Sequence, residues 1–402
     1  MSDDVLSGKK IILGVTGGIA AYKSCYLVRE LVQRGAEVRV VMTPSALEFI
    51  TPLTLSSLSK NKVIVNTFPS FQADGCDTVT WHIDYGMWAD LMIIAPATIN
   101  TIAKIANGFA DNALTTLVPA LRSPLIIAPA ADVDMYMHKV TQENIKRLTE
   151  IGYFIVEAEE GELASGLSGK GRLASINKIL DAAGLVLSGY KKDLTGRKIL
   201  ITAGPTYEDI DPVRFIGNRS SGKMGYALAK AAYLRGAEVI LISGPSAEIA
   251  YPELKLVKVR SADEMKKEVN KYFSSSEILI MSAAVADYKP KKFTSSKIKK
   301  EEKLNAINVM QTNDVLGSLK KNNQVVIGFA LETENELQNA KKKLKDKKLD
   351  MIVLNSLKDK KSGFEFDTNR ITIIHKNGKS ARYPLMSKLE AANKILTEIL
   401  KI

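Results

Sequence analysis

The stretch Arg34–Pro44 reads RGAEVRVVMTP, and its first five residues recur in the other half of the chain at the start of RGAEVILISGP (235–245). In both copies a short apolar run follows the acidic residue. Such a run is typical of a buried strand. Because the two copies lie in different halves of the chain, the stretch predicts one architecture that is used twice.

The residues around the first copy extend the pattern. An expected strand that ends in glycines precedes the first RGAEV copy. Between that strand and the copy, the apolar residues Ala21, Cys25, Val28 and Val32 recur at helical spacing. The other expected strands of this half are KIILGVTGG (10–18), LMIIAPAT (91–98) and PLIIAPAA (124–131). Short apolar strands that alternate with helices predict a doubly wound, mostly parallel sheet.

The second half repeats this scheme. KILITAGPT (198–206) and ILIMSAAVAD (278–287) correspond to strands of the first half, and the final residues form an amphipathic helix with Leu389, Ala392 and Leu396 on one stripe with Ile399. The polar end of AGLVLSGYKKDLTGRK (183–198) separates the halves. We therefore expect an α/β protein of two domains, residues 1–190 and residues 191–402.

Composition narrows the class of protein. The 402 residues are 46% hydrophobic and 25% charged, and 56 Lys+Arg against 44 Asp+Glu give a net charge of +12. The positive charge suits phosphorylated small molecules or nucleic acid, but no nucleic-acid-binding motif is present. With two cysteines, Cys25 and Cys76, and no apolar run of about 20 residues, we expect a cytoplasmic protein without a disulfide framework or a membrane span.

Two glycine-containing stretches are candidate anion sites. In TGGIAAYK (16–23), glycines between a strand and a helix allow backbone N–H groups to approach a phosphate, although a tight turn without a ligand fits equally well. IGNRSSGKMG (216–225) has the glycine–lysine spacing of a P-loop, but Met224 stands where the hydroxyl that binds magnesium belongs. This second stretch lies in a loop that is longer than its counterpart in the first half.

The segment that contains His82 holds further candidates. His82, between Trp81 and Trp88, is either a catalytic base or a structural histidine. Thr98 and Asn100, with Thr101, follow a buried strand, where they could bind the edge of a polar ring or cap the next helix. The residues alone leave these alternatives open.

Several of these motifs occur together in one family. GGIAAYK, His82, PATINT (96–101), the following ADN and GELASGLSGKGR (161–172) resemble the flavin-dependent phosphopantothenoylcysteine decarboxylases over residues 8–180. The resemblance implies a flavodoxin-like domain that binds FMN, with His82 as the active-site base. The cofactor-binding residues that it implies are Gly17, Gly18, Thr43, Thr98 and Asn100.

The second half resembles another family. The loop and strand of residues 202–239, with SAAVADYKP (282–290), KIKK (297–300) and GFALETE (328–334), is similar to phosphopantothenate–cysteine ligase over residues 193–402. The resemblance implies a Rossmann-like domain that uses CTP and Mg²⁺, with Asn218 and Lys297 acting on the acyl-cytidylate and triphosphate. The nucleotide contacts that it implies are Ser282, Ala283, Asp287, Lys297, Asn313, Asp314, Val315, Leu316, Phe329, Lys343 and Lys347.

Both families in this order resemble the bifunctional enzymes of coenzyme A biosynthesis. The partners implied are CTP, 4′-phosphopantothenate and cysteine, the product is 4′-phosphopantetheine, and the expected assembly is a homo-oligomer with flavin sites shared between subunits. Lys343 and Lys347 lie in a lysine run that could instead be solvated surface. Residues Thr312–Asp314 replace the Asn-Pro-Asp usual in the ligase family.

The first domain departs from its family at two catalytic candidates. Asp132 replaces an asparagine that faces the substrate, and Ser165 replaces a cysteine that donates a proton. Asp132 would repel a substrate carboxylate unless it is protonated or paired, for instance with Arg172. These departures support an alternative hypothesis, in which the chain is a ligase whose flavin domain is a binding or assembly scaffold without turnover.

Overall fold

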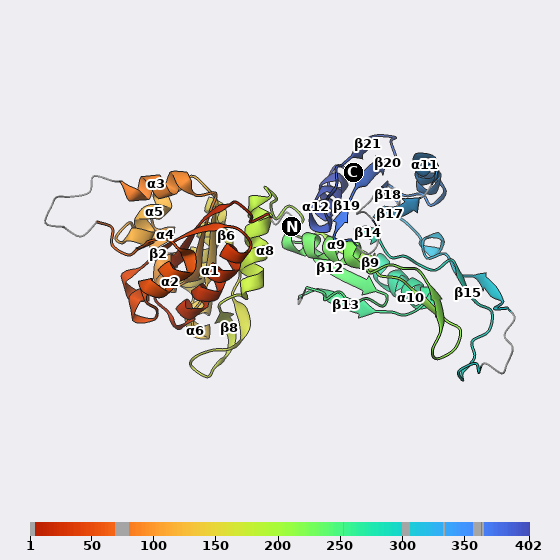
Figure 1. Cartoon of the computed structure of the whole chain (residues 1–402), viewed down its shortest axis with the longest axis horizontal. Helices are drawn as coiled ribbons and strands as arrows, with labels where there is room; N and C mark the ends of the chain where they lie inside the picture. Colours follow the sequence, from red (N-terminus) through yellow and green to blue (C-terminus); the bar gives the residue numbers. More distant parts are fainter. Residues whose placement is uncertain are drawn as a thin grey trace. The chain divides into compact units, whose positions relative to one another are not determined.

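The computed structural model describes residues 5–68, 80–251, 253–299, 306–332, 334–356, 363 and 366–402 (Figure 1). The chain forms two compact units, Met1–Lys191 and Lys192–Ile402. Cys76 lies outside the described residues. Within the described part of the chain, no helix is long and apolar enough to cross a membrane.

The N-terminal unit is built on a six-stranded parallel sheet, as expected. Without its two-residue edge strand β3, the strand order is 2-1-3-4-5, the order of flavodoxin. The doubly wound, flavodoxin-like prediction is therefore confirmed. In spatial order the strands are β3 (Val63–Ile64), β2 (Glu37–Met42), β1 (Lys10–Val15), β4 (Leu91–Ala97), β5 (Leu125–Pro129) and β6 (Phe154–Ile155).

Helices cover both faces of this sheet, because its central strands are apolar on both sides. The helices against one face are α1 (Lys23–Gln33), α2 (Pro52–Ser59) and α8 (Ile176–Leu187). Those against the other are α3 (Trp81–Trp88), α4 (Ile99–Ala106), α5 (Ala113–Ala120), α6 (Val133–Met137) and α7 (Lys139–Ile151). A hairpin of β7 (Glu159–Glu162) and β8 (Ser168–Arg172) projects beyond the sheet.

The C-terminal unit has an eight-stranded sheet whose first six strands are parallel. Those six follow the order 3-2-1-4-5-6 of the Rossmann fold, as predicted, and two antiparallel strands extend the edge. In spatial order the strands are β13 (Lys255–Lys258), β12 (Glu238–Ser243), β9 (Lys198–Ala203), β14 (Ile278–Met281), β17 (Val325–Glu332), β18 (Met351–Ser356), β20 (Ile371–His375) and β21 (Ser380–Arg382).

The helices of this unit also lie on both faces of their sheet. On one face are α9 (Lys223–Leu234) and α12 (Lys388–Ile399), and on the other are α10 (Ala262–Phe273) and α11 (Glu336–Asp346). The described part of this unit also contains three two-stranded ribbons. They are β10 (Tyr207–Asp209) with β11 (Phe215–Gly217), β15 (Tyr288–Pro290) with β16 (Val309–Gln311), and β19 (Thr368–Asn369) with β22 (Met386–Ser387).

The repeated RGAEV stretch makes the same turn in both units. Gly35 and Gly236 adopt φ values of 85° and 93° directly after α1 and α9. In each turn the N–H groups of the glycine and of the alanine after it bond back to carbonyls of the last helical turn, which is a Schellman motif. The left-handed glycine ends the helix and directs the chain into β2 or β12, so the repeat encodes a helix-to-strand junction.

The second copy carries an additional anchor. Arg235 is 0% exposed and donates to both carboxylate oxygens of Asp193, each at 2.8 Å. Its other guanidinium N–H groups reach the carbonyl of Asn393 at 2.9 Å and the hydroxyl of Thr397 at 3.1 Å. One buried side chain thus joins the start of the unit, the end of α9, and α12.

We predict that Gly236→Ala lowers the free energy of unfolding of the C-terminal unit by about 1–2 kcal/mol, because an L residue is strained in the left-handed region. A Cβ at Gly236 would also lie 2.6 Å from the Thr195 hydroxyl. The measurement is urea unfolding followed by circular dichroism. Gly184→Ala, inside α8 with nothing within 4 Å of the added Cβ, is the control and should not destabilise.

Candidate active sites

The first candidate site lies where the strand order reverses between β1 and β4. A cavity of about 1060 Å³ opens at the carboxyl edge of the sheet. Its walls come from the segments that follow β1, β2, β4 and β5, and from the β7–β8 hairpin. Doubly wound sheets bind their ligands at this topological position.

Thr16 ties together the two segments that diverge at this point. Its buried hydroxyl donates to the carbonyl of Pro96 at 2.8 Å and accepts the N–H of Thr98 at 2.9 Å. These backbone groups lie at the end of β4 and directly after it. The hydroxyl therefore sets the width of the crevice between β1 and β4.

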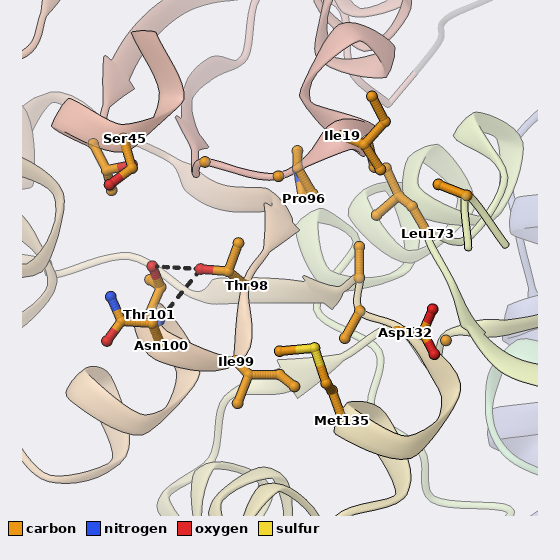
Figure 2. Close-up of a pocket in the computed structure, with 18 of the residues that line it drawn as sticks. Ile19, Ser45, Pro96, Thr98, Ile99, Asn100, Thr101, Asp132, Met135 and Leu173 are labelled. Atoms are coloured by element: carbon orange, nitrogen blue, oxygen red, sulfur yellow. Dashed lines mark hydrogen bonds between the residues drawn. The ribbon is translucent and has the colours of Figure 1, made fainter. Parts of the chain in front are cut away.

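The five cofactor-binding candidates all line this cavity: Gly17, Gly18, Thr43, Thr98 and Asn100. At Gly17 a Cβ would lie 2.5 Å from the carbonyl oxygen of Ser45, so only glycine permits the close approach of these two loops. The Thr98 hydroxyl also caps α4, accepting the N–H of Thr101 at 3.4 Å. Figure 2 shows this cap on the wall of the cavity that carries Asn100, so the capping and lining roles coexist.

Of the three catalytic candidates of this domain, His82 and Ser165 do not line the cavity within one chain. His82 lies in α3, with its ring edge-on to Trp81 at a centroid distance of 5.8 Å. Ser165 lies in the turn of the β7–β8 hairpin, where its hydroxyl accepts the N–H of Leu167 at 3.4 Å. Residues 162–164, immediately before Ser165, do line the cavity.

Asp132 lines the cavity, and Arg172, given above as an example of a residue that could pair with it, has a different partner among the described residues. The guanidinium of Arg172 instead contacts Glu159 at 3.3 Å. Burial raises the pKa of Glu159, but the N–H of Ser175 and the Lys178 ammonium hold it below its ordinary value, so Glu159 is a strong competitor for Arg172. Within the described part of the chain, the carboxylate of Asp132 has no hydrogen-bond or ion-pair partner.

The structure adds residues that the sequence prediction did not include. Lys104 and Asp111 line the cavity and form an ion pair at 2.5 Å. Asn112 also lines it and begins α5 with a capping box to Thr115. The Asp-Asn pair before an apolar run was a detectable signal for this cap. Met135, from α6, supplies an apolar wall (Figure 2).

The second candidate site lies at the corresponding edge of the C-terminal sheet, where the order reverses between β9 and β14. A cavity of about 760 Å³ extends there over the ends of β14, β17 and β18. The start of α9 forms part of its wall. Gly222 adopts φ 85° at the N-cap, and a Cβ at Gly225 would lie 2.5 Å from that of Ala203, so α9 begins close against β9.

Asn218 and Lys297 have different positions relative to this cavity. Asn218 lines it, and its amide donates to the carbonyls of Ala284 and Val285, each at 3.1 Å. Lys297 is exposed and does not line it. The adjacent Ile298 donates its N–H to Asp211 at 3.2 Å, which holds this loop beside the β10–β11 ribbon.

The other nucleotide candidates all line the cavity: Ser282, Ala283, Asp287, Asn313, Asp314, Val315, Leu316, Phe329, Lys343 and Lys347. Lys343 donates to the carbonyl of Phe329 at 2.9 Å, and burial lowers the pKa of its ammonium. Lys347 pairs with Asp314 at 2.5 Å. Burial raises the pKa of Asp314, but this pair and backbone N–H groups bring it below its ordinary value. Both lysines therefore belong to the cavity wall rather than to a purely solvated run.

The resemblance implies Mg²⁺ as a cofactor of the second domain, without implying which residues bind it. No cluster of three or more His, Cys, Asp or Glu residues suited to a metal ion occurs among the residues that the structure describes. Two carboxylates, Asp287 and Asp314, line this cavity.

Comparison with known proteins assigns each half to a family. The family model Flavoprotein matches residues 2–186, and the model for the DNA/pantothenate metabolism flavoprotein C-terminal domain matches residues 194–402. Coenzyme A biosynthesis bifunctional protein CoaBC of Bacillus subtilis is 45% identical over 400 residues, which cover 98% of this chain and 97% of that protein.

Two further relatives span most of the chain. CoaBC of Borreliella burgdorferi is 43% identical over 396 residues, 96% of this chain and 98% of that protein. A cysteine/cysteine sulfinic acid decarboxylase from an unknown prokaryotic organism is 49% identical over 362 residues, 88% of this chain and 99% of that protein.

The fold, the two cavities and these matches define a two-domain enzyme of pantothenate metabolism with an N-terminal flavoprotein domain. The chain belongs to the family of the Coenzyme A biosynthesis bifunctional protein CoaBC. It is a bifunctional enzyme, with a flavoprotein decarboxylase domain followed by a ligase domain. The bifunctional prediction is thereby confirmed over the scaffold alternative.

We predict that Thr16→Val lowers the free energy of unfolding of the N-terminal unit by about 1–3 kcal/mol, because two buried backbone groups lose their partner. Urea unfolding of the full chain measures this loss. Thr16→Ser keeps the hydroxyl and should retain most of the stability. Equal losses in the two variants would show that the methyl group, rather than the hydroxyl, matters at this position.

Proposed function

We propose that the C-terminal domain joins cysteine to 4′-phosphopantothenate with consumption of CTP, and that the N-terminal domain converts the product to 4′-phosphopantetheine with FMN. One observation carries this proposal. Each unit has a cavity at the switch point of its own sheet, and the residues implied by the matching family line it, except for His82, Ser165 and Lys297.

The ligase step requires activation, because a carboxylate is a poor electrophile. The substrate carboxylate attacks the α-phosphorus of CTP, pyrophosphate leaves, and an acyl-cytidylate forms. The amine of cysteine then attacks the acyl carbon and CMP leaves. Both transfers develop negative charge that fixed donors stabilise.

Asn218 is the donor that we assign to this intermediate. Its amide lies beside the carbonyls of Ala284 and Val285 at the end of β14, next to the start of α9, where helix N–H groups favour anions. Lys297 would reach the triphosphate by a movement of its loop. Asp287, Asn313 and the other lining residues would hold the nucleotide.

Magnesium fits this arrangement as a nucleotide-borne ion. Mg²⁺ is commonly bound by substrate phosphates together with one or two carboxylates, rather than by a complete protein cage. Asp287 and Asp314 are the carboxylates available in the cavity wall. We assign them as the candidate protein contacts of the ion.

The cavity of the N-terminal unit fits a flavin. Its volume of about 1060 Å³ lies at the upper end of ligand pockets, and Gly17 and Gly18 leave a wall without side chains. FMN bound there would supply reversible hydride acceptance, which provides an electron sink for the loss of CO2. Thr43, Thr98 and Asn100 would hold it by their polar groups.

The catalytic groups of this domain come together only in part within one chain. Asp132 lines the cavity and Ser165 lies on the adjacent hairpin, whereas His82 lies on α3 outside the lining. We propose that a neighbouring subunit of a homo-oligomer supplies His82 as the base. A cytoplasmic location remains a prediction.

We predict that Asn218→Asp reduces ligation at least about 100-fold, the scale of losing an electrostatic donor in the transition state. The carboxylate would repel both the two carbonyls and the phosphoryl group. Pyrophosphate release, in the presence of CTP, 4′-phosphopantothenate and cysteine, measures the effect.

The matched control for that variant is Asn270→Asp on the exposed side of α10, which should retain wild-type ligation. Flavin content should be unchanged in both variants. Normal ligation by Asn218→Asp would remove this residue from the mechanism.

Asp132 favours a second candidate reaction, the decarboxylation of free cysteine. The nitrogen of phosphopantothenoylcysteine is an uncharged amide, whereas that of free cysteine is an ammonium group. An unpartnered carboxylate in the cavity attracts an ammonium and repels a carboxylate. The relative named cysteine/cysteine sulfinic acid decarboxylase, at 49% identity, acts on such amino acids by its name.

We predict that Asp132→Asn lowers kcat/KM for free cysteine by about 10-fold or more, the value of a charged hydrogen bond, and does not lower kcat/KM for phosphopantothenoylcysteine. CO2 release measures both. Asp134→Asn, an exposed carboxylate in the first turn of α6, is the control. If the wild-type chain turns over phosphopantothenoylcysteine but not cysteine, this second candidate is excluded.

A further inference from the structure

The three residues that follow β16, residues 312–314, all line the second cavity, and we call them the 312–314 loop. The first residue of this loop is anchored to the segment after β14. The N–H of Thr312 donates to the carbonyl of Asp287 at 2.9 Å, and its hydroxyl donates to the carbonyl of Ala286 at 2.6 Å. The entry to the loop is therefore fixed against the cavity wall.

The last residue of the loop is anchored as well. One carboxylate oxygen of Asp314 accepts the N–H of Leu316 at 3.1 Å, and the other pairs with Lys347 at 2.5 Å. Thr312 and Asp314 thus hold the two ends of the loop. The position of the residue between them, Asn313, depends on a different contact.

Asn313 is held by a side chain from outside the cavity lining. Its amide N–H donates to Oδ1 of Asp263, in the first turn of α10, at 2.8 Å. Asp263 is 50 residues away along the chain and does not line the cavity. Since an ionised carboxylate only accepts hydrogen bonds, Asp263 also determines which end of the Asn313 amide faces it.

Asp263 is itself held in place by a second strand. Its Oδ2 accepts the ammonium of Lys289 at 2.5 Å, and Lys289 lies in β15, the ribbon partner of β16. The hydrogen bonds from Lys289 and Asn313 bring the pKa of Asp263 below its ordinary value, so the carboxylate is ionised at neutral pH. One carboxylate therefore connects α10 with both the ribbon and the loop that continues it.

The chain uses this contact at a position where the ligase family usually has a proline. A proline ring fixes the φ angle of its own residue, which makes a loop rigid without any partner. Asn313 has no such restraint. The hydrogen bond to Asp263 is a restraint on the same residue, supplied through the side chain instead of the backbone.

We propose that Asp263 is a positioning residue of the ligase site, which keeps the 312–314 loop in its nucleotide-binding conformation through Asn313. The inference rests on the proposed ligase function and extends it to a residue that touches no substrate. A loop that is ordered before the nucleotide binds loses less conformational freedom on binding. Asp263 should therefore improve the affinity for CTP more than the rate of the chemical step.

The first test removes the carboxylate. Asp263→Ala should raise KM for CTP about 3- to 10-fold, less than the full value of a charged hydrogen bond because Thr312 and Asp314 still hold the loop ends. The changes in kcat and in KM for cysteine should stay below about 2-fold. The ion pair with Lys289 is partly exposed, so its loss should cost little stability.

Glu264→Ala is the matched control. Glu264 lies in the same first turn of α10, where it accepts the N–H of Arg260 at 2.7 Å, so its removal takes the same charge from the start of the helix. This variant should keep the wild-type KM for CTP. An equal rise in KM in the two variants would assign the effect to the helix start and overturn the proposal.

A double-mutant cycle then separates the Asn313 contact from the other contacts of Asp263. Asn313→Pro removes the amide and introduces the restraint of the family's proline. Whatever KM this variant has, adding Asp263→Ala to it should change KM for CTP by less than about 2-fold. If Asp263→Ala has the same effect in both backgrounds, the carboxylate acts through Lys289 or α10, and the proposal is wrong.

Hydrogen exchange of the full-length chain without nucleotide tests the positioning by itself. Amides of residues 309–316 should exchange at least about 3-fold faster in Asp263→Ala, because the loop opens locally more often, and the double variant should not show this increase over Asn313→Pro. Unchanged exchange in Asp263→Ala would overturn the positioning role, whether or not the chain is a ligase. The expected exchange difference in a chain that does not ligate would overturn the proposed function alone.

Discussion

The reversal of strand order beside the first strand of each sheet determines where each unit has its cavity. At β1 and β4, and again at β9 and β14, successive connections leave in opposite directions, so the carboxyl ends of two adjacent strands remain uncovered. Backbone groups that no helix covers must find other partners. Thr16 satisfies two of them in the first unit, and the amide of Asn218 contacts two carbonyls in the second.

Most of the fold could be predicted because its strands are short, apolar and bounded by glycine or proline. The expected strand of residues 10–18, for example, contains β1, and the repeated RGAEV stretch correctly indicated two equivalent units. The apolar stripe predicted for the first helix was less accurate. In α1 the buried residues include Ser24, whose hydroxyl donates to the carbonyl of Ala95. A search for apolar periodicity cannot detect a polar residue that is buried by a single hydrogen bond.

Some site residues could be predicted from the sequence and others could not. Residues that directly follow a strand, such as Thr98 and Ser282, lie at the predicted cavities because their positions depend on local chain direction. His82 and Lys297 lie outside the cavity linings, since a helix and a loop place them independently of the sheet. Nor did the sequence indicate that Lys388 is buried and lines the second cavity. A lysine at a helix start is normally solvated, and it is buried here where β19 pairs with β22 before α12.

The buried guanidinium of Arg235 has a consequence for how the second unit can be rearranged. It binds Asp193 near the first residue of the unit and α12 near the last. The first and last segments of the unit are therefore close together in space. Proteins with neighbouring termini tolerate circular permutation and insertion into other proteins. We therefore expect the ligase unit to tolerate circular permutation or fusion, provided that Asp193 and the final helix remain with it.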